Sequence, residues 1–391
     1  MHEIWKKNLY AIFIAEFAVL MGFSSVLPFM PLFIKEVGQT TNAEAAFWTG
    51  IASGGAGLAM FLSAPLWGIA ADRWGRKPML LRAQFGGALT VVLMAFAPNI
   101  GTLVVLRIAQ GILAGTIAAA SALVASQTPQ NKLPFSMGLL MVAVFSGTTL
   151  GPFLGGLMAD SLGYHMTFLI TSAIIFLGGF IILFVVNEKF EKATREQATS
   201  LSSLWHLATS KKLFMLLVIT FAIFAGLQMT SLIIPLHISE LSPQAMVATQ
   251  SGVALGIIGL LSVVSSVSIG RLGERIPLRK ILISSCFLGG ISYCAPLLAG
   301  TVTQFVIFVG LTGLFIGGLQ TTSNTLVGLA VPRTQQGMAY GLAASATSLG
   351  MGIGALAGGS LSSLIGFRPM FAVTGILFII VGFLAIKLIK Q

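Results

Sequence analysis

Apolar stretches of about 20 residues follow one another along nearly the whole chain, separated by short polar or charged turns. A helix needs about this many apolar residues to cross a hydrocarbon core roughly 30 Å thick. A transmembrane β-barrel would instead show segments of about ten residues with alternating polarity, which the sequence does not contain. The sequence therefore predicts an all-α membrane protein with twelve spans, at about residues 8–34, 47–71, 78–97, 101–126, 134–159, 164–187, 212–238, 246–270, 277–300, 301–328, 335–363 and 368–389.

Basic residues gather on one side of these spans. Of the 22 Lys and Arg residues, Lys35 and Arg368 fall in outer loops and Arg107 within a span, which leaves 19 in segments assigned to the cytoplasm, Arg82 among them. This asymmetry follows the positive-inside rule and predicts that both termini lie in the cytoplasm. It also explains the net charge of +11 without a nucleic-acid partner, because a nucleic-acid binder gathers its basic residues on one soluble face.

The chain repeats itself weakly at a distance of 202 or 203 residues. "LGYHMTFLITSA" (162–173) matches "IGFRPMFAVTGI" (365–376), and the charged stretch at 68–77 has a partial copy at 270–280. Halves related in this way share one orientation, as in transport proteins with parallel repeats and a substrate site between them near the membrane midplane. The predicted organisation is an N-terminal six-helix bundle (1–187), a cytoplasmic linker (188–211) and a C-terminal six-helix bundle (212–391).

The turn between the second and third spans concentrates charge in a chain that has only 8% charged residues. A carboxylate there can pair with neighbouring basic groups and with the positive amino end of a helix, forming a charge latch that holds one closed state. The alternative is an ordinary positive-inside loop. The residues predicted to form this gate are Gly68, Asp72, Arg73, Gly75, Arg76 and Lys77.

Three glycines in the fifth span, Gly147, Gly151 and Gly155, recur every four residues and share one helix face, which lets a neighbouring backbone approach closely. Gly156 follows them directly. Pro152 removes a backbone donor in mid-span and is expected to bend the helix. The alternative is tight packing alone, since small residues are common at membrane helix interfaces.

Four stretches resemble known family motifs. G-x-x-x-D-R-x-G-R-K at 68–77 resembles the signature of the major facilitator superfamily. "LRIAQGILAG" (106–115), "SGTTLGPFLGG" (146–156) and "LMGFSSVLPFMP" (20–31) resemble the fourth-, fifth- and first-helix patterns of its twelve-helix drug:proton antiporter branch, and the chain is similar to Gram-positive multidrug efflux pumps. The resemblance implies the major facilitator fold in a bacterial plasma membrane, alternating access, and a part in proton transfer for Arg107. We expect a monomer.

Two charged residues, Glu16 and Arg107, fall well inside spans. An intramembrane charge costs at least about 2.5–3.5 kcal/mol, so both side chains are expected to face the protein interior or a water-filled cavity. Removal from water favours the protonated form of a carboxyl group, which makes Glu16 a candidate to carry a proton or to bind a cationic substrate. The alternatives are a structural ion pair or a snorkelling side chain for Glu16 and an interhelical hydrogen bond for Arg107.

The resemblance places spans 1, 4, 7 and 10 around the substrate cavity. The polar residues expected to contact substrate there are Glu16, Gln110, Gln228 and Asn324, among Phe and Met side chains. A largely apolar pocket with few polar anchors suits lipophilic, often cationic compounds. The alternative for each amide is an interhelical hydrogen bond. His237, near the outer end of span 7, is expected at a wet helix end.

An ion gradient is the expected source of energy, because no phosphate-binding P-loop occurs in the sequence. No cofactor or metal site is expected, and the four His residues are too scattered for a catalytic site, which argues against an enzyme. The sequence thus predicts proton-coupled efflux of small lipophilic, cationic drugs, with protons, substrate and membrane lipid as the partners. The alternative is proton-coupled uptake or export of a single polar solute such as a sugar on the same fold.

Overall fold

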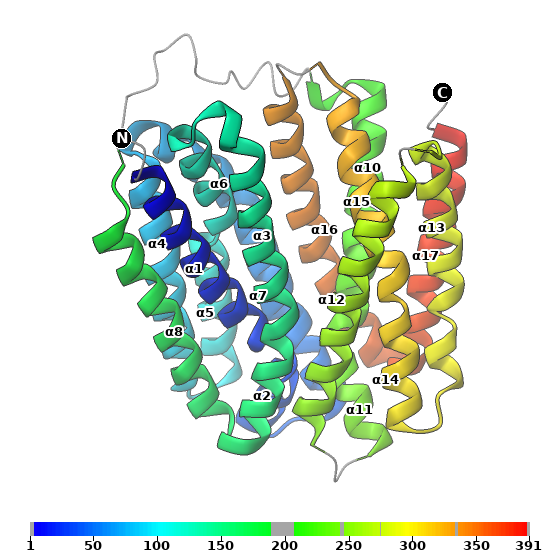
Figure 1. Ribbon diagram of the computed structural model, residues 1–391. Helices are drawn as coiled ribbons and strands as arrows, with labels where there is room; N and C mark the ends of the chain where they lie inside the picture. Colours follow the sequence, from blue (N-terminus) through cyan, green and yellow to red (C-terminus); the bar gives the residue numbers. More distant parts are fainter. Residues whose placement is uncertain (1–3, 189–206, 243–245, 274, 333–334, 389–391) are drawn as a thin grey trace.

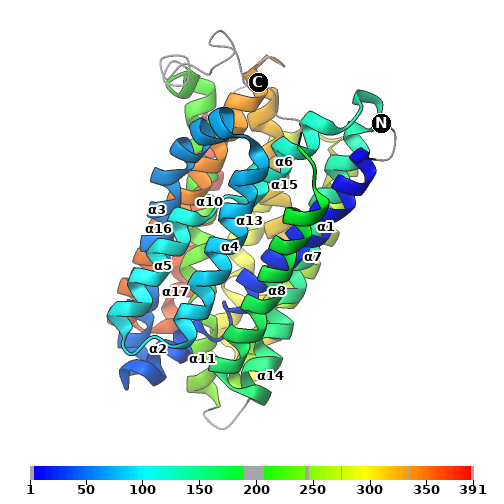
Figure 2. The same ribbon diagram turned by 90° about the vertical axis from the view of Figure 1, so that its left-hand side faces the viewer.

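The computed structural model describes residues 4–188, 207–242, 246–273, 275–332 and 335–388. Twelve helical segments in these ranges are long and apolar enough to cross a membrane, which confirms the predicted fold class, and they run roughly side by side (Figure 1; Figure 2). The helices are α1 (Ile4–Ser25), α2 (Met30–Gly38), α3 (Asn42–Trp74), α4 (Arg76–Ala95), α5 (Ile100–Leu113), α6 (Thr116–Gln127), α7 (Leu133–Leu162) and α8 (Tyr164–Val185), followed by α10 (Lys211–Ser231), α11 (Ile234–Leu241), α12 (Val247–Leu272), α13 (Leu278–Ser292), α14 (Val302–Leu311), α15 (Gly313–Leu329), α16 (Gln336–Ile365) and α17 (Phe367–Leu388).

The helices α1 to α8 form one side of the molecule and α10 to α17 the other (Figure 1). The described ends of the chain, Ile4 and Leu388, lie at the same end of the molecule, called here the terminal end, and the opposite end is the far end (Figure 1; Figure 2). Most of the predicted linker, 188–211, lies outside the described residues. The linker and the domain boundaries therefore stay predictions.

In the described ranges, four spans each consist of two consecutive α-helices: the first, fourth, seventh and tenth. α1 and α2 are separated by residues 26–29, α5 and α6 by 114–115, α10 and α11 by 232–233, and α14 and α15 by Thr312. Proline near the start of α2 and of α11 accounts for two of the breaks, because it has no N–H to donate and begins a helix better than it continues one. Interruptions at corresponding places in two repeats mark the region where transport proteins build their central site.

The two sides touch most extensively along two helix pairs, α3 with α16 and α7 with α12, and α2 also contacts α11. Glycine brings backbone directly against backbone there. A Cβ atom at Gly50 would lie 2.7 Å from the Ala355 carbonyl oxygen and 2.9 Å from the Cα atom of Gly359. A Cβ atom at Gly156 would overlap the carbonyl oxygen of Ala248. These contacts belong to the parts of the four helices nearest the far end, so the far end is closed.

The same four helices separate toward the terminal end. Bulky side chains on α3 are exposed in that region, including Leu66 at 65% and Ile69 at 62%. Five glycines in this region have open space beside them. A Cβ atom added at any of them would have no described atom of another part of the chain within 4 Å. They are Gly68 in α3, Gly138 in α7, Gly270 in α12, and Gly337 and Gly341 in α16. The conformation is therefore open at the terminal end.

Candidate functional site

Glu16 lies on the buried face of α1, in line with Ile12 and Val19 at helical spacing. Its side chain is 0% exposed, and neither carboxyl oxygen has a hydrogen-bond partner among the described residues. Thr116, the first residue of α6, faces the carboxyl group without meeting the geometry of a hydrogen bond. Because an ionised carboxylate without a partner is very costly to bury, this environment suits a neutral acid or a carboxylate neutralised by a bound cation.

Arg107 lies on α5, and its Nη1 donates a hydrogen bond to the side-chain oxygen of Gln110, one turn along the helix, at 2.7 Å. Gln110 is buried, and the Arg107 Nε is buried without a partner in the described ranges. The two residues predicted to couple transport to protons are therefore not paired with each other in this conformation. Arg107 binds Gln110, and the Glu16 oxygens bind neither.

The polar anchors predicted in the second half of the chain are not joined. Gln228 on α10 is half-buried and Asn324 on α15 is exposed, and the described side chains form no hydrogen bond between the two. Instead, the Oγ atoms of Thr220 and Ser323 lie 2.8 Å apart in the buried contact between α10 and α15. Sequence reasoning missed Thr220 because no local pattern distinguishes it from the other hydroxyl residues of the spans.

The charged turn is tied to the end of α8. Gly75 makes the turn between α3 and α4 with a φ of 98°, which glycine adopts readily and other residues rarely do. The backbone N–H groups of Arg76 and Lys77 donate to the two carboxyl oxygens of Glu188, at 2.9 and 2.8 Å. The Lys77 ammonium donates to the Val186 carbonyl oxygen at 2.6 Å. A carboxylate does lie on the amino end of a helix here, where the helix dipole stabilises it, but both belong to the same half of the chain.

The second copy of the turn keeps part of this arrangement, since the Arg279 guanidinium donates to the Ile386 carbonyl oxygen near the end of α17 at 2.7 Å. In the first copy Arg73 is exposed, and a Cβ atom at Gly68 would lie in open space. The side chain of Asp72 lies outside the described residues. The gate therefore stays a prediction.

We expect Asp72→Asn to lower transport several-fold while the amount of protein inserted in the membrane stays normal. The change removes one charge from the predicted latch and keeps the size of the side chain. Transport rate and membrane content, measured on the same vesicles, check this. Glu36→Gln, which removes a charge from the exposed last turn of α2, is the control, and an unchanged rate in the Asp72 variant would rule out the latch.

The glycine face predicted in the fifth span, formed by Gly147, Gly151 and Gly155, packs against the backbone of α1. A Cβ atom at Gly151 would lie 2.5 Å from a carbonyl oxygen of that helix. Gly156, on another face, packs against Ala248 of α12 on the other side of the molecule. This stretch of α7 therefore lies between the helix that carries the buried carboxyl group and the opposite half.

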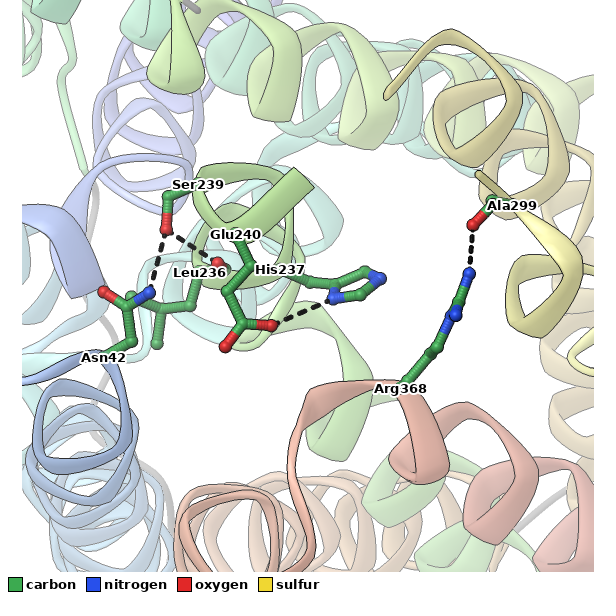
Figure 3. A network of polar contacts seen from close by, with 7 residues as sticks. All are labelled: Asn42, Leu236, His237, Ser239, Glu240, Ala299 and Arg368. Carbon is green, nitrogen blue, oxygen red and sulfur yellow. Dashed lines mark hydrogen bonds and ion pairs between the residues drawn. The ribbon is translucent and has the colours of Figure 1, made fainter. Parts of the chain in front are cut away.

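Polar contacts also join the two sides at the far end. Ser239 of α11 accepts a hydrogen bond from the side-chain amide of Asn42, at the start of α3, at 3.3 Å (Figure 3). Asp160, near the end of α7, accepts one from the backbone N–H of Thr249 in α12 at 2.6 Å. Asp160 thus lies on the amino end of a helix in the other half, where the helix dipole favours a carboxylate. Sequence analysis predicted such a latch at the charged turn and missed this one.

His237 of α11 is only 4% exposed, so the expectation of a wet helix end is wrong. Its ring lies against Phe305 and Phe371, with centroids 4.9 and 6.2 Å away. Its Nδ1 is 3.5 Å from a carboxyl oxygen of Glu240 (Figure 3). The imidazole is therefore held mainly by aromatic packing.

Aromatic packing at this place recurs in the first half. The matching segments "MPLFI" (30–34) and "IPLHI" (234–238) put Phe33 where the second half has His237, and Phe33 packs on Phe168 with centroids 5.0 Å apart. We expect His237→Phe to raise the free energy of unfolding by about 1 kcal/mol. An aromatic pair contributes about 0.5–1.5 kcal/mol, and the phenyl ring has no nitrogen atoms to be buried without a hydrogen bond. Thermal unfolding in detergent measures this. A lower melting temperature than the native protein's would show that the imidazole has a polar partner it needs.

Comparisons with known proteins agree with this architecture. The family model described as Major Facilitator Superfamily matches residues 12–265 and 244–391. Multidrug resistance protein MdtG of Escherichia coli (strain SMS-3-5 / SECEC) is 33% identical over 372 residues, which cover 95% of this chain and 91% of that protein.

Solved structures share the fold at lower identity. The nucleoside transporter NupG superposes with a TM-score of 0.80 at 14% identity, covering 98% of this chain and 99% of that one. A bacterial homologue of the human lysosomal transporter Spinster, in an inward-facing and occupied conformation, superposes with a TM-score of 0.81 at 13% identity, covering 97% and 95%. These structures support the fold alone. The family match and the relative MdtG show a multi-pass transporter of the bacterial plasma membrane and not an enzyme. The chain belongs to the major facilitator superfamily.

Proposed function

We propose that the protein exports small lipophilic, cationic compounds in exchange for protons, by alternating access between its two halves. The observation that carries the proposal is Glu16, a fully buried carboxyl group whose oxygens have no hydrogen-bond partner among the described residues. The other acidic residues lie at helix ends, in turns or outside the described ranges. The relative MdtG is named a multidrug resistance protein, which supports a drug as the substrate.

One buried carboxyl group is enough to couple the two movements. A proton or a cationic substrate neutralises Glu16, and because both use the same charge, the binding of either weakens the binding of the other. The ionised, empty carboxylate is the costly state. The halves therefore change position with Glu16 neutralised, by substrate in one direction and by a proton in the other. The cycle needs no cofactor beyond the proton gradient.

The open terminal end gives the substrate its entrance, since the positive-inside rule assigns that end to the cytoplasm. Release outside requires the far-end contacts to part, including the hydrogen bond from Thr249 to Asp160. Protons then enter from the far end. Arg107 lies about 10 Å along the span from the far-end start of α5, one turn before Gln110, and we assign the pair to the proton's path toward Glu16.

The substrate contacts are assigned to residues on all four interrupted spans. Glu16 is on the first, Gln110 on the fourth, Gln228 on the seventh and Asn324 on the tenth. Few polar anchors among apolar side chains tolerate substrates of different shapes, because hydrophobic contact is not directional. This arrangement favours lipophilic compounds over a sugar, which would need many fixed hydrogen-bond partners.

Inside-out vesicles with a respiration-generated proton gradient test the proposal. A lipophilic cation such as ethidium is expected to release part of the gradient at a rate that rises with the amount of the protein in the membrane, and vesicles lacking the protein are the control. Proton release by a sugar, with none by any lipophilic cation tried, would overturn drug export and support the alternative of a single polar solute.

A further inference from the structure

The fourth span, which carries Arg107 and Gln110, is interrupted next to the buried carboxyl group. α5 ends at Leu113 and α6 begins at Thr116, and between them Gly115 has a φ of 113°, in the region that glycine adopts readily. No backbone hydrogen bond joins α5 to α6 in the part of the chain that the structure describes. The break therefore frees carbonyl groups that a continuous helix would pair.

Two side chains from neighbouring helices take up these carbonyl groups. The Trp67 indole N–H, from α3, donates to the Ile112 carbonyl oxygen at 2.6 Å, and the Arg82 Nη2, from α4, donates to that of Ala114 at 3.0 Å. The guanidinium carbon of Arg82 lies 3.6 Å from the centre of the Trp67 ring, so the cation also stacks on the indole. A specific pair of side chains thus stabilises the break.

The position of Arg82 differs from the one predicted from the sequence. Its place beside the charged turn predicts a cytoplasmic segment, but the residue lies in the second turn of α4 and is half-buried. Its Nε and Nη1 atoms are buried and have no hydrogen-bond partner among the described residues. Leaving buried donors unpaired is costly, which suggests that another state of the protein uses them.

Few charged groups face Glu16 from the helices around it. α7, α8 and α6 pack on α1. The described part of α7 carries one charged residue, Asp160, which lies close to the far end. The titratable residues of α8 are Tyr164 and His165, also at the far end, and α6 has no titratable residue. Arg107, on α5, is already hydrogen-bonded within its own helix. None of these groups places an unpaired cation beside the carboxyl group.

α4 does bring a cation close. Its Gln84 donates to the α1 backbone next to Glu16 at 3.0 Å. The Arg82 Nη2 lies 3.9 Å from where a Cβ atom of Gly115 would be, and the next residue, Thr116, faces Glu16. The Arg82 guanidinium, whose Nε and Nη1 have no hydrogen-bond partner among the described residues, and the unpartnered carboxyl group of Glu16 therefore lie on either side of the break.

We propose that Arg82, supported by Trp67, is a positioning residue of the proton site: it holds the fourth span broken so that Thr116 faces Glu16, and its charge favours release of the Glu16 proton. The inference rests on the proposed role of Glu16 as proton carrier. An anion formed at Glu16 attracts the guanidinium, and any movement of Arg82 toward it weakens the hydrogen bond to Ala114. Loss of the proton thereby changes the shape of the fourth span.

The pH dependence of ethidium-induced proton release is the readout, because a merely structural side chain would not move its midpoint. Arg82→Gln is expected to shift the midpoint upward by about one pH unit, since Glu16 holds its proton more tightly without the nearby positive charge. Arg82→Lys keeps the charge and is expected to keep the midpoint near the native value. Thr116→Val removes the hydroxyl that faces the carboxyl group at nearly constant size, and is expected to give a smaller upward shift.

Arg279→Gln is the matched control, because the Arg279 guanidinium also donates to a carbonyl oxygen, that of Ile386, but in the other half. Its midpoint is expected to equal that of the native protein. An unshifted midpoint in Arg82→Gln overturns the inference. If Arg82→Gln fails to insert in the membrane, an unshifted midpoint in Thr116→Val overturns it instead. A pH dependence that survives Glu16→Gln overturns the proposed function instead, so the two failures are distinguishable.

Discussion

Glu16→Gln is expected to lower ethidium-induced proton release by about tenfold or more in inside-out vesicles. Glutamine has the same size, but it cannot take up or release a proton and has no charge to attract a cation. Neither carboxyl oxygen of Glu16 is hydrogen-bonded among the described residues, so the amide breaks no bond described there. Membrane content and melting temperature are therefore expected to stay near native values, which separates lost coupling from lost protein.

Glu36→Gln is the matched control, because Glu36 in α2 is exposed and its replacement leaves Glu16 untouched. It is expected to release protons at the native rate. Glu16→Asp keeps the acid on a shorter side chain and is expected to keep proton release at a reduced rate. Native proton release by Glu16→Gln would mean that another group carries the proton and that Glu16 has only a structural part.

Linking the two halves at the far end is expected to stop transport. The side chains of Asn42 in α3 and Ser239 in α11 are hydrogen-bonded across the halves at 3.3 Å (Figure 3). A cysteine at each position, joined by a short cleavable thiol cross-linker after replacement of Cys286 and Cys294, holds the described conformation. In the proposed cycle, export requires the far end to open. Ethidium efflux is therefore expected to fall to background after linking and to return after cleavage.

A pair within one half provides the control for this experiment. The side chains of Asn8 and Gln127 are hydrogen-bonded at 2.5 Å between α1 and the end of α6. Cysteines at these two positions, linked in the same way, are expected to leave efflux close to native, because both lie in the same half, which moves as a unit in the proposed cycle. Undiminished efflux after linking positions 42 and 239 would contradict alternating access through this contact.

The number of spans was predictable because long apolar runs alternate with charged turns. The ends of the spans were less predictable. The apolar run predicts a first span at about 8–34, whereas α1 begins at Ile4 and the second part of the span ends at Gly38. Lys6 and Lys7 interrupt the apolar pattern without ending the helix, since a helix continues beyond the hydrocarbon layer wherever its backbone bonds are satisfied.

The interruption of the fourth span was beyond sequence reasoning. A glycine inside an apolar run is compatible with a continuous helix, and the break at Gly115 depends on Trp67 and Arg82, whose carbonyl partners are 45 and 32 residues away in sequence. Local patterns carry no record of such distant partners. Pro152, expected to bend its helix, lies inside the continuous helix Leu133–Leu162, and the bend stays a prediction.

The site was partly predictable for the same reason. Burial of Glu16 followed from its place inside an apolar run, and the contact between Arg107 and Gln110 follows from their spacing of three residues on one helix. Asp160 and Glu188 gave no signal, because an acidic residue at a helix end usually faces water. Their partners are backbone N–H groups of other helices, which only the packed structure brings to them.

The glycine contacts at the far end bear on ion leakage. A cell that stores energy as a proton gradient loses it through any continuous file of water molecules across the membrane. Long side chains at a gate change rotamers and open transient gaps, whereas the surfaces that meet at Gly50 and Gly359 have no side chains to move. Such a seal excludes water by close fit and not by strong bonds. In the proposed cycle, the two surfaces can therefore part once per turnover and still be proton-tight when they meet again.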